Sequence, residues 1–409
     1  MHPYLAIARG LNARGHSTAV GSYPALRDNV EKARVEFFPL RPDAYQPQVQ
    51  VALTEELSRP VWEQVRLRSQ VILPNVSATF EDLREAVHGA DLLITSSTIL
   101  PAALVAAKTC IPWILTYHML TGFSSLAERV AANLLPGYGR WFSVSTMARP
   151  FVAQLLKPMI FPELQWLTAL WRQNGLVYDR GLSPYEQFPP KLVLGLVSQV
   201  FAPWNSRLPL NTRLTGFPMY EGTFAGDTSL EALESFLETG EPPLLFTLGS
   251  TRHVHDFFPA SLAAAVQLKR RALFLIGNHP RTVLPDPLPK GMLAFGEVPY
   301  STVFPRAEVN IHHGGIGTTT LALRAGRPML VVPRSFDQPD NAVRAQRLGV
   351  ARVVTRAKYT PARVTAELEP ILEDERYRIR ATELAKLLRT EDGTRVACDA
   401  IEDFLAANI

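Results

Sequence analysis

The residues with the clearest chemistry lie in a glycine-rich turn, Ile311-His312-His313-Gly314-Gly315-Ile316-Gly317-Thr318-Thr319. An apolar strand over 309–311 leads into this turn, and a helical run over 320–325 follows it. Glycine tolerates positive φ angles and lets the backbone approach a ligand closely. A helix that begins after such a turn presents free N–H groups and the positive end of its dipole. The turn therefore predicts an anion site, and phosphate is the anion that fits it best.

One further polar pair, Asp337-Gln338, is expected at the same rim. It follows an apolar strand over 329–333. Ligands of open parallel sheets bind at the carboxyl ends of the strands. This pair should therefore lie near the glycine turn.

The elements that position these residues alternate between strand and helix along both halves of the chain. In the first half, helices are expected over 4–14 and 101–108, and strands over 17–21, 35–40, 91–95, 112–117, 191–197 and 200–201. In the second half, a helix is expected over 228–239, and strands over 244–248, 272–276, 292–295, 308–311, 329–333 and 351–354. This alternation predicts an α/β fold with two doubly wound, Rossmann-like domains facing a cleft.

The length supports two domains, because 409 residues exceed what one compact core usually holds. We expect an N-terminal domain over 1–218, a linker and helix over 219–240, a C-terminal domain over 241–394 and a final helix over 395–409. The segment from Phe123 to Trp171, rich in Phe and Trp, is either plain core or the lining of an apolar cleft.

Composition excludes several classes of protein. The net charge of +4 is small and the basic residues are dispersed, so a nucleic-acid partner is not expected. Two cysteines, Cys110 and Cys398, give no disulfide framework or zinc site and fit a reducing compartment. No apolar run reaches the roughly 18 residues of a membrane span, and no signal peptide is visible. We expect a cytoplasmic protein.

The chain resembles the UDP-glycosyltransferase superfamily, which has the GT-B fold, and within it the bacterial branch of antibiotic, sterol and rhamnolipid glycosyltransferases. The resemblance covers nearly the whole chain and is strongest from Phe246 to Val350. The residues that carry it are Phe246-Thr247-Leu248-Gly249-Ser250, Val298-Pro299-Tyr300, His312 to Thr319, Ala325-Gly326-Arg327-Pro328, Asp337-Gln338 and Asn341-Ala342, with Arg14-Gly15-His16 and Thr215-Gly216-Phe217-Pro218 in the first half.

The resemblance implies a donor site in the second half that needs neither metal nor cofactor. His313 would contact the diphosphate of a UDP- or dTDP-sugar, with Gly249, Ser250, Gly315, Gly317 and Thr318 as further diphosphate ligands. Asp337 and Gln338 would bind the sugar hydroxyls, and Val298 and Tyr300 would lie near the base. One position departs from several branches of the superfamily, because Leu321 replaces a glutamate that holds the ribose. For His312 we favour a structural role.

The acceptor side departs further. Relatives begin with a strand and a loop, roughly Gly-Ser-x-Gly-Asp-x-His-Pro, whereas this sequence begins at Met1-His2-Pro3. The family's general base lies three residues before that proline, which here falls before Met1. We therefore expect the first strand of the N-terminal domain to be missing and its sheet to be left with an open edge or a gap. His2 is a weak candidate for the base. Ser97 and His118, at predicted strand ends, are candidates for the acceptor cleft.

The expected function is an inverting glycosyltransferase that moves a sugar from a UDP- or dTDP-sugar to a hydroxyl of an apolar small molecule or lipid. An apolar acceptor also leaves open a transient contact with the inner face of the membrane. The missing base leaves a second hypothesis, a non-catalytic nucleotide-sugar-binding protein or an inactive fragment. Another GT-B enzyme, such as a sugar-nucleotide epimerase, is the nearer alternative.

Overall fold

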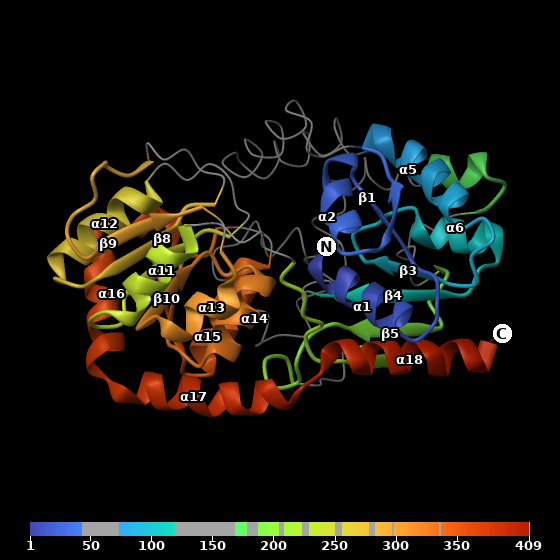
Figure 1. Ribbon diagram of the computed structural model, residues 1–409. Helices are drawn as coiled ribbons and strands as arrows, with labels where there is room; N and C mark the ends of the chain where they lie inside the picture. Colours follow the sequence, from blue (N-terminus) through green and yellow to red (C-terminus); the bar gives the residue numbers. More distant parts are fainter. Residues whose placement is uncertain are drawn as a thin grey trace, which may run out of the picture. The chain divides into compact units, whose positions relative to one another are not determined.

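The computed structural model describes ten stretches of the chain (Figure 1): residues 1–42, 73–118, 168–177, 187–203, 208–222, 229–249, 256–277, 283–296, 298–334 and 337–408. The chain divides into two compact units. Unit 1 comprises 1–199, 204–222 and 392–409, and unit 2 comprises 200–203 and 223–391. Most of the Phe- and Trp-rich segment from Phe123 to Trp171 lies outside the described residues.

Unit 2 is built on a six-stranded parallel sheet with the strand order β12-β11-β10-β7-β8-β9. Its strands are β7 Leu244–Thr247, β8 Ala272–Leu275, β9 Met292–Phe295, β10 Val309–His312, β11 Met329–Val331 and β12 Ala351–Val353. Each strand matches its expected range, and none extends beyond that range by more than one residue. The strands were predictable because short apolar runs between helices are typical of parallel strands buried on both faces.

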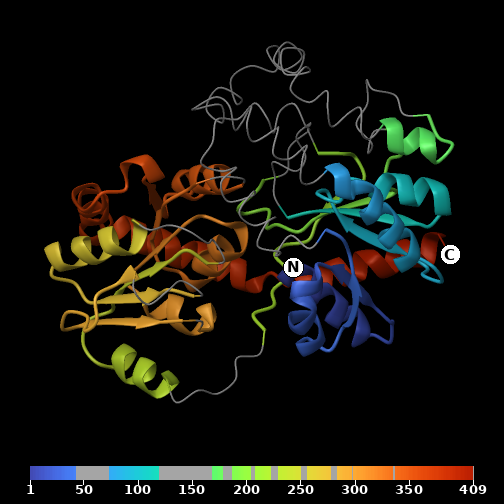
Figure 2. The same ribbon diagram turned by 90° about the horizontal axis from the view of Figure 1, so that it is seen from above.

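Helices cover both faces of this sheet, with yellow α12 on one face and yellow-green α11 on the other in Figure 2. The helices are α11 Ser229–Glu238, α12 Phe257–Gln267, α13 Tyr300–Val303, α14 Ile316–Ala325, α15 Gln338–Arg347, α16 Pro361–Glu373 and α17 Glu375–Thr390. This layering defines a doubly wound α/β domain.

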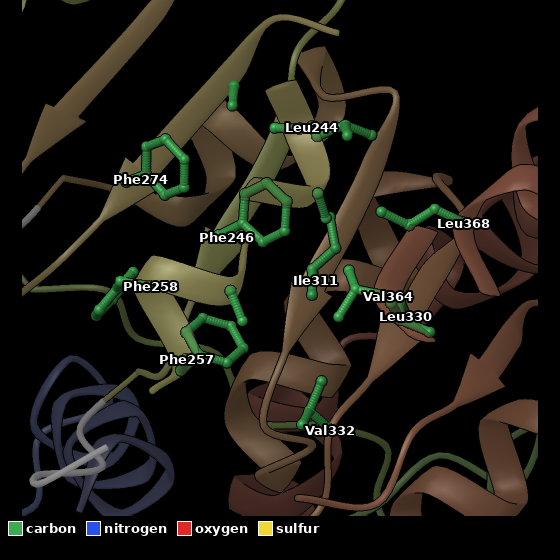
Figure 3. Packing of buried hydrophobic residues seen from close by; sticks show 14 of the residues in the cluster. Leu244, Phe246, Phe257, Phe258, Phe274, Ile311, Leu330, Val332, Val364 and Leu368 are labelled. Carbon is green, nitrogen blue, oxygen red and sulfur yellow. The ribbon is translucent and has the colours of Figure 1, made fainter. Parts of the chain in front are cut away.

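The core of unit 2 lies between the sheet and the helices α12 and α16 (Figure 3). Phe246 stacks on Phe274 with ring centroids 5.3 Å apart, and Phe257 of α12 contacts the edge of Phe246 at 6.5 Å. Alternation along β10 directs Ile311 into this core and places Asn310 and His312 on the opposite face of the sheet. The packing fixes the strand ends that carry the polar turns.

Unit 1 contains two parallel sheets. The first pairs β1 Ala19–Ser22 with β2 Glu36–Pro39. The second has the order β3-β4-β5-β6, formed by Leu93–Ser96, Trp113–Tyr117, Leu192–Gly195 and Thr212–Leu214. Within the described ranges, β1 pairs only with β2, and β3 pairs only with β4. Each of these two strands therefore has one unpaired side there.

The helices of unit 1 are α1 His2–Asn12, α2 Arg27–Lys32, α5 Leu73–Ala86, α6 Ala102–Thr109 and α18 Gly393–Asn408. Ile7 and Leu11 of α1 share a core cluster with Ile401 and Phe404 of α18. Leu5 and Ala8 of α1 pack instead with Val20 and Phe37 of β1 and β2. Helix α1 thus packs both on α18 and on the two-stranded sheet.

In the first half of the chain, one predicted strand was wrong and one observed strand was missed. Val200 and Phe201 lie in a turn and not in a strand. The strand that follows β5 is β6, Thr212–Leu214, which the sequence analysis missed. Its three residues include the exposed Arg213, so they show no apolar run that could mark a strand.

No helix within the described ranges combines the length and the apolar character that crossing a membrane requires.

Candidate functional site

The predicted anion site lies where the sheet of unit 2 reverses its strand order. β7 and β10 are parallel neighbours, with Thr247 opposite His312. From this pair, β8 and β9 extend to one side and β11 and β12 to the other. Gly249 follows β7 and His313 follows β10, so both stand at the carboxyl ends of the central strands. Open α/β sheets bind ligands at such a switch point.

Gly249, His313 and Thr318 lie against one another at this point. Gly249 has a φ of +58°, and a Cβ built on it would lie 2.7 Å from Cε1 of His313 and 3.1 Å from Oγ1 of Thr318. Any larger residue at 249 would push against the imidazole and the threonine hydroxyl. The structure therefore brings together three of the residues that the sequence singled out.

The turn itself depends on its glycines for different reasons. Gly314 has a φ of +86°, and a Cβ there would lie 2.7 Å from Cγ1 of Val331. A Cβ on Gly315 would run into Nε2 of His313. A Cβ on Gly317 would meet no described atom within 4 Å, so this glycine borders open space at the start of α14.

His312 has the structural role that we favoured. It is fully buried, its Nδ1 accepts the N–H of Gly314 at 3.0 Å, and its Nε2 lies 3.2 Å from Sδ of Met329. Burial lowers the pKa of His312 to about 3, with a smaller contribution from His313. The imidazole is therefore neutral and holds the first glycine of the turn.

His313 is 7% exposed, and burial lowers its pKa to about 4. Its Nδ1 is buried and has no hydrogen-bond partner among the described residues. A neutral ring with an unsatisfied buried nitrogen is uncommon in folded proteins and often indicates a functional role. Without a ligand, the imidazole of His313 is therefore neutral at pH 7 and retains capacity for a hydrogen bond.

The carboxylate of Asp337 accepts one of the free N–H groups at the N-terminus of α14. Its Oδ2 accepts the N–H of Ile316 at 3.1 Å and an amide hydrogen of Asn341 at 2.7 Å. The first N–H groups of a helix have no acceptor within the helix, so those of Gly317 and Thr318 remain the ones that can bind a ligand there. Burial raises the pKa of Asp337, and the hydrogen bonds from Asn341 and Ile316 oppose this shift.

Gln338 and Asn341 lie on α15, directly after Asp337. Oε1 of the buried Gln338 accepts the N–H of Arg334 at 2.9 Å. Asn341 is 2% exposed, and its amide nitrogen also donates to the carbonyl of Gly314 at 2.9 Å. The segment after β11 is therefore hydrogen-bonded to the glycine turn after β10.

Tyr300 reaches the site through Thr247. Its hydroxyl lies 2.9 Å from Oγ1 of Thr247, and the same Oγ1 accepts the N–H of Gly249 at 3.1 Å. Tyr300 also stacks on Phe304 with ring centroids 4.6 Å apart, and Val298 is buried just before it. The hydroxyl of the buried Thr247 therefore holds the backbone of the Gly249 turn.

The candidates for the acceptor side lie in unit 1. Ser97 and His118 follow the neighbouring strands β3 and β4, and the N–H of Ser97 donates to the carbonyl of Thr116 at 3.2 Å. Burial lowers the pKa of His118 to about 4, and the N-terminal ammonium group adds to this shift. His2 begins α1 and meets Tyr220 edge-on, with ring centroids 6.1 Å apart. Ser97 and His118 therefore both lie at the carboxyl ends of neighbouring strands in this sheet.

The structure thus assembles most of the expected donor-site residues in unit 2, while Ser250 lies outside the described residues. Sequence reasoning missed the roles of Thr247 and Asn341. Both carried a signal, since Thr247 is a polar residue within a buried strand and Asn341 is four residues after Asp337, one helical turn away.

Comparisons with known proteins agree with this picture. Residues 262–398 match the family model "Erythromycin biosynthesis protein CIII-like, C-terminal domain". The chain is 28% identical to O-mycaminosyltylonolide 6-deoxyallosyltransferase of Streptomyces fradiae, over 99% of this chain and 94% of that protein.

Solved structures show the same fold. The glycotransferase of kitacinnamycin superposes with a TM-score of 0.73 at 22% identity, covering 98% of this chain and 95% of the other. Glycosyltransferase VinC in complex with DTDP gives a TM-score of 0.69 at 18% identity, covering 99% and 96%.

Two Rossmann-like parallel-sheet domains, with a glycine turn at the switch point of the second, define the GT-B fold. The chain belongs to the GT-B glycosyltransferase family, among the relatives of antibiotic glycosyltransferases.

Proposed function

We propose that the chain is an inverting glycosyltransferase that moves a sugar from a nucleoside-diphosphate sugar to a hydroxyl of an apolar small molecule or lipid. One observation carries this proposal: Gly249, the turn at His313 and Asp337 meet around the N-terminus of α14. A diphosphate bound there would accept the N–H groups of Gly317 and Thr318. Such fixed dipoles stabilise the negative charge that develops on the leaving group as the glycosidic bond breaks.

The other donor-site residues have assigned roles in this proposal. Asp337 and Gln338 bind hydroxyls of the sugar, and a buried polar pair of this kind rejects epimers that leave one of its groups unpaired. Gly315 and Ser250 add diphosphate contacts. Val298 and Tyr300 lie beside the base, where Tyr300 also supports the Gly249 turn through Thr247.

We propose dTDP as the preferred nucleotide. Leu321 stands where several branches of the superfamily have a glutamate for the ribose, and an apolar side chain there offers nothing to a 2′-hydroxyl. Among the structural neighbours, VinC was solved in complex with DTDP. A deoxyribose has no 2′-hydroxyl to bury beside Leu321, whereas a ribose would bury a hydroxyl without a hydrogen-bond partner there and lose binding free energy.

On the acceptor side, the hydroxyl oxygen would attack the anomeric carbon opposite the leaving diphosphate, and its proton would pass to a base. Ser97 and His118 line the acceptor side in this proposal, while His2 remains a weak candidate for the base.

The function is tested by titration calorimetry with dTDP, UDP and ADP, followed by transfer assays. dTDP- and UDP-sugars would be offered with a panel of apolar hydroxylated acceptors, and the anomeric configuration of any product read by NMR. Binding of dTDP with inverted product supports the proposal. Retention of configuration contradicts inversion, binding without turnover favours a nucleotide-sugar-binding protein, and absence of binding contradicts the donor site.

A further inference from the structure

Asn341 joins the two halves of the donor site. Both hydrogens of its side-chain amide are used, one by the carbonyl of Gly314 at 2.9 Å and one by Oδ2 of Asp337 at 2.7 Å. The side chain is 2% exposed, so these bonds form away from water. In the proposed function, the first acceptor belongs to the turn for the diphosphate and the second to the carboxylate for the sugar.

The bonds also distinguish the two oxygens of Asp337. Oδ2 already accepts from Asn341 and from the N–H of Ile316. A third donor at the same oxygen would crowd these two, so Oδ1 is the oxygen with capacity for a sugar hydroxyl. A carboxylate held at one oxygen presents the other in a defined direction, which a freely rotating side chain does not.

We propose that Asn341 is a positioning residue. It orients Asp337 for the sugar and holds the glycine turn at a fixed position relative to Asp337. This inference rests on the proposed function, because it assigns Asn341 an effect on the sugar of the donor. Asn341 itself touches neither the sugar nor the diphosphate. It acts through Asp337 on sugar recognition and through Gly314 on the shape of the turn.

A plainly structural role makes a different prediction. If Asn341 merely satisfied buried backbone, its loss would weaken binding of the whole donor evenly, nucleotide and sugar together. If it orients Asp337, its loss removes the part of the affinity that the sugar contributes. The informative quantity is therefore the ratio of the Kd for dTDP to the Kd for dTDP-glucose, measured on the same variant.

The test is a double-mutant cycle with N341A, D337A and the double variant, each titrated with dTDP and with dTDP-glucose. Hydrogen bonds to charged groups contribute enough that N341A should lower the ratio about tenfold, as should D337A. Because Asn341 acts through Asp337, the double variant should show no further loss in the ratio. UDP and UDP-glucose serve as a parallel pair.

Asn310 provides a matched control. It is another fully buried asparagine of unit 2, and its amide nitrogen donates to the carbonyl of Phe304 at 3.3 Å, away from Asp337. N310A should lower stability and leave the ratio unchanged. An unchanged ratio in N341A, or additive losses in the double variant, would overturn the role of Asn341. Failure of the wild-type protein to bind either nucleotide pair would instead overturn the donor site itself.

Discussion

The hydroxyl of Tyr300 and Oγ1 of Thr247 lie 2.9 Å apart, and this contact ties helix α13 to the end of β7. Because Oγ1 of Thr247 also accepts the N–H of Gly249, the position of Gly249 depends on a tyrosine 51 residues further along the chain. The two hydroxyls form a short chain of hydrogen bonds behind the site.

We predict that T247V weakens donor binding without disturbing the core. Valine keeps the shape of threonine but removes the acceptor of the Gly249 N–H, which costs about 1 kcal/mol and leaves the turn less well defined. The dTDP affinity measured by calorimetry should fall several-fold. Y300F, which removes the outer hydroxyl only, should have a smaller effect. A larger loss in Y300F than in T247V would contradict this order.

A second prediction concerns Gly249, with Gly277 as its matched control. Both glycines follow neighbouring strands and have left-handed backbones, with φ of +58° and +55°. Alanine at either position costs about 1–2 kcal/mol because of that conformation. Only at Gly249 would the new Cβ meet His313 and Thr318, whereas at Gly277 the nearest atom is the carbonyl oxygen of Gly249 at 3.8 Å. G249A should therefore lose dTDP binding while G277A keeps it.

A third prediction separates stability from binding at Gly317. Alanine in a helix is more stable than glycine by roughly 0.5–1 kcal/mol, and a Cβ at Gly317 would meet no described atom within 4 Å. G317A should therefore melt at a slightly higher temperature. Its methyl group would project into the space proposed for the diphosphate, so dTDP affinity should fall while binding of thymidine, which has no phosphate, stays unchanged. Equal losses for both ligands would argue against a diphosphate at this position.

The buried histidines predict a pH dependence of stability. Burial lowers the pKa of His313 to about 4, whereas an unfolded histidine titrates near 6.5. Between these values the unfolded chain binds a proton that the folded site does not, so stability falls as pH falls from 6.5 to 4. His313 alone should contribute up to about 3 kcal/mol to this loss at pH 4.

Urea titrations between pH 4.5 and 7.5 would measure this effect. H313N lacks the titrating group and should show a flatter dependence than the wild-type protein. H88N, a replacement of an exposed histidine of unit 1, is the control. A slope in H313N that equals that of the wild type would show that other groups cause the acid sensitivity.

The local pattern of apolar and polar residues predicted much of the fold but less of the candidate site. The strands of unit 2 were predictable because each is a buried apolar run between helices, as at Leu244–Thr247. β6 was missed, and the strand at 200–201 was wrongly predicted, because two or three residues carry too little pattern. The pairing of Asp337 with the N–H of Ile316 could not be foreseen, since it depends on how α15 docks beside α14.

The order of the strands in unit 2 also has a consequence for how the domain folds. β7 pairs with β10, and this pairing of Leu244 with Val309 spans more of the chain than any other in that sheet. Long loops cost more entropy to close, so the halves β7–β9 and β10–β12 should gain structure before they join. Gly249 and His313 come together only when β7 pairs with β10. Because a ligand that contacts both Gly249 and His313 would bind only when β7 and β10 are paired, dTDP binding should slow the opening of this pairing in hydrogen-exchange measurements.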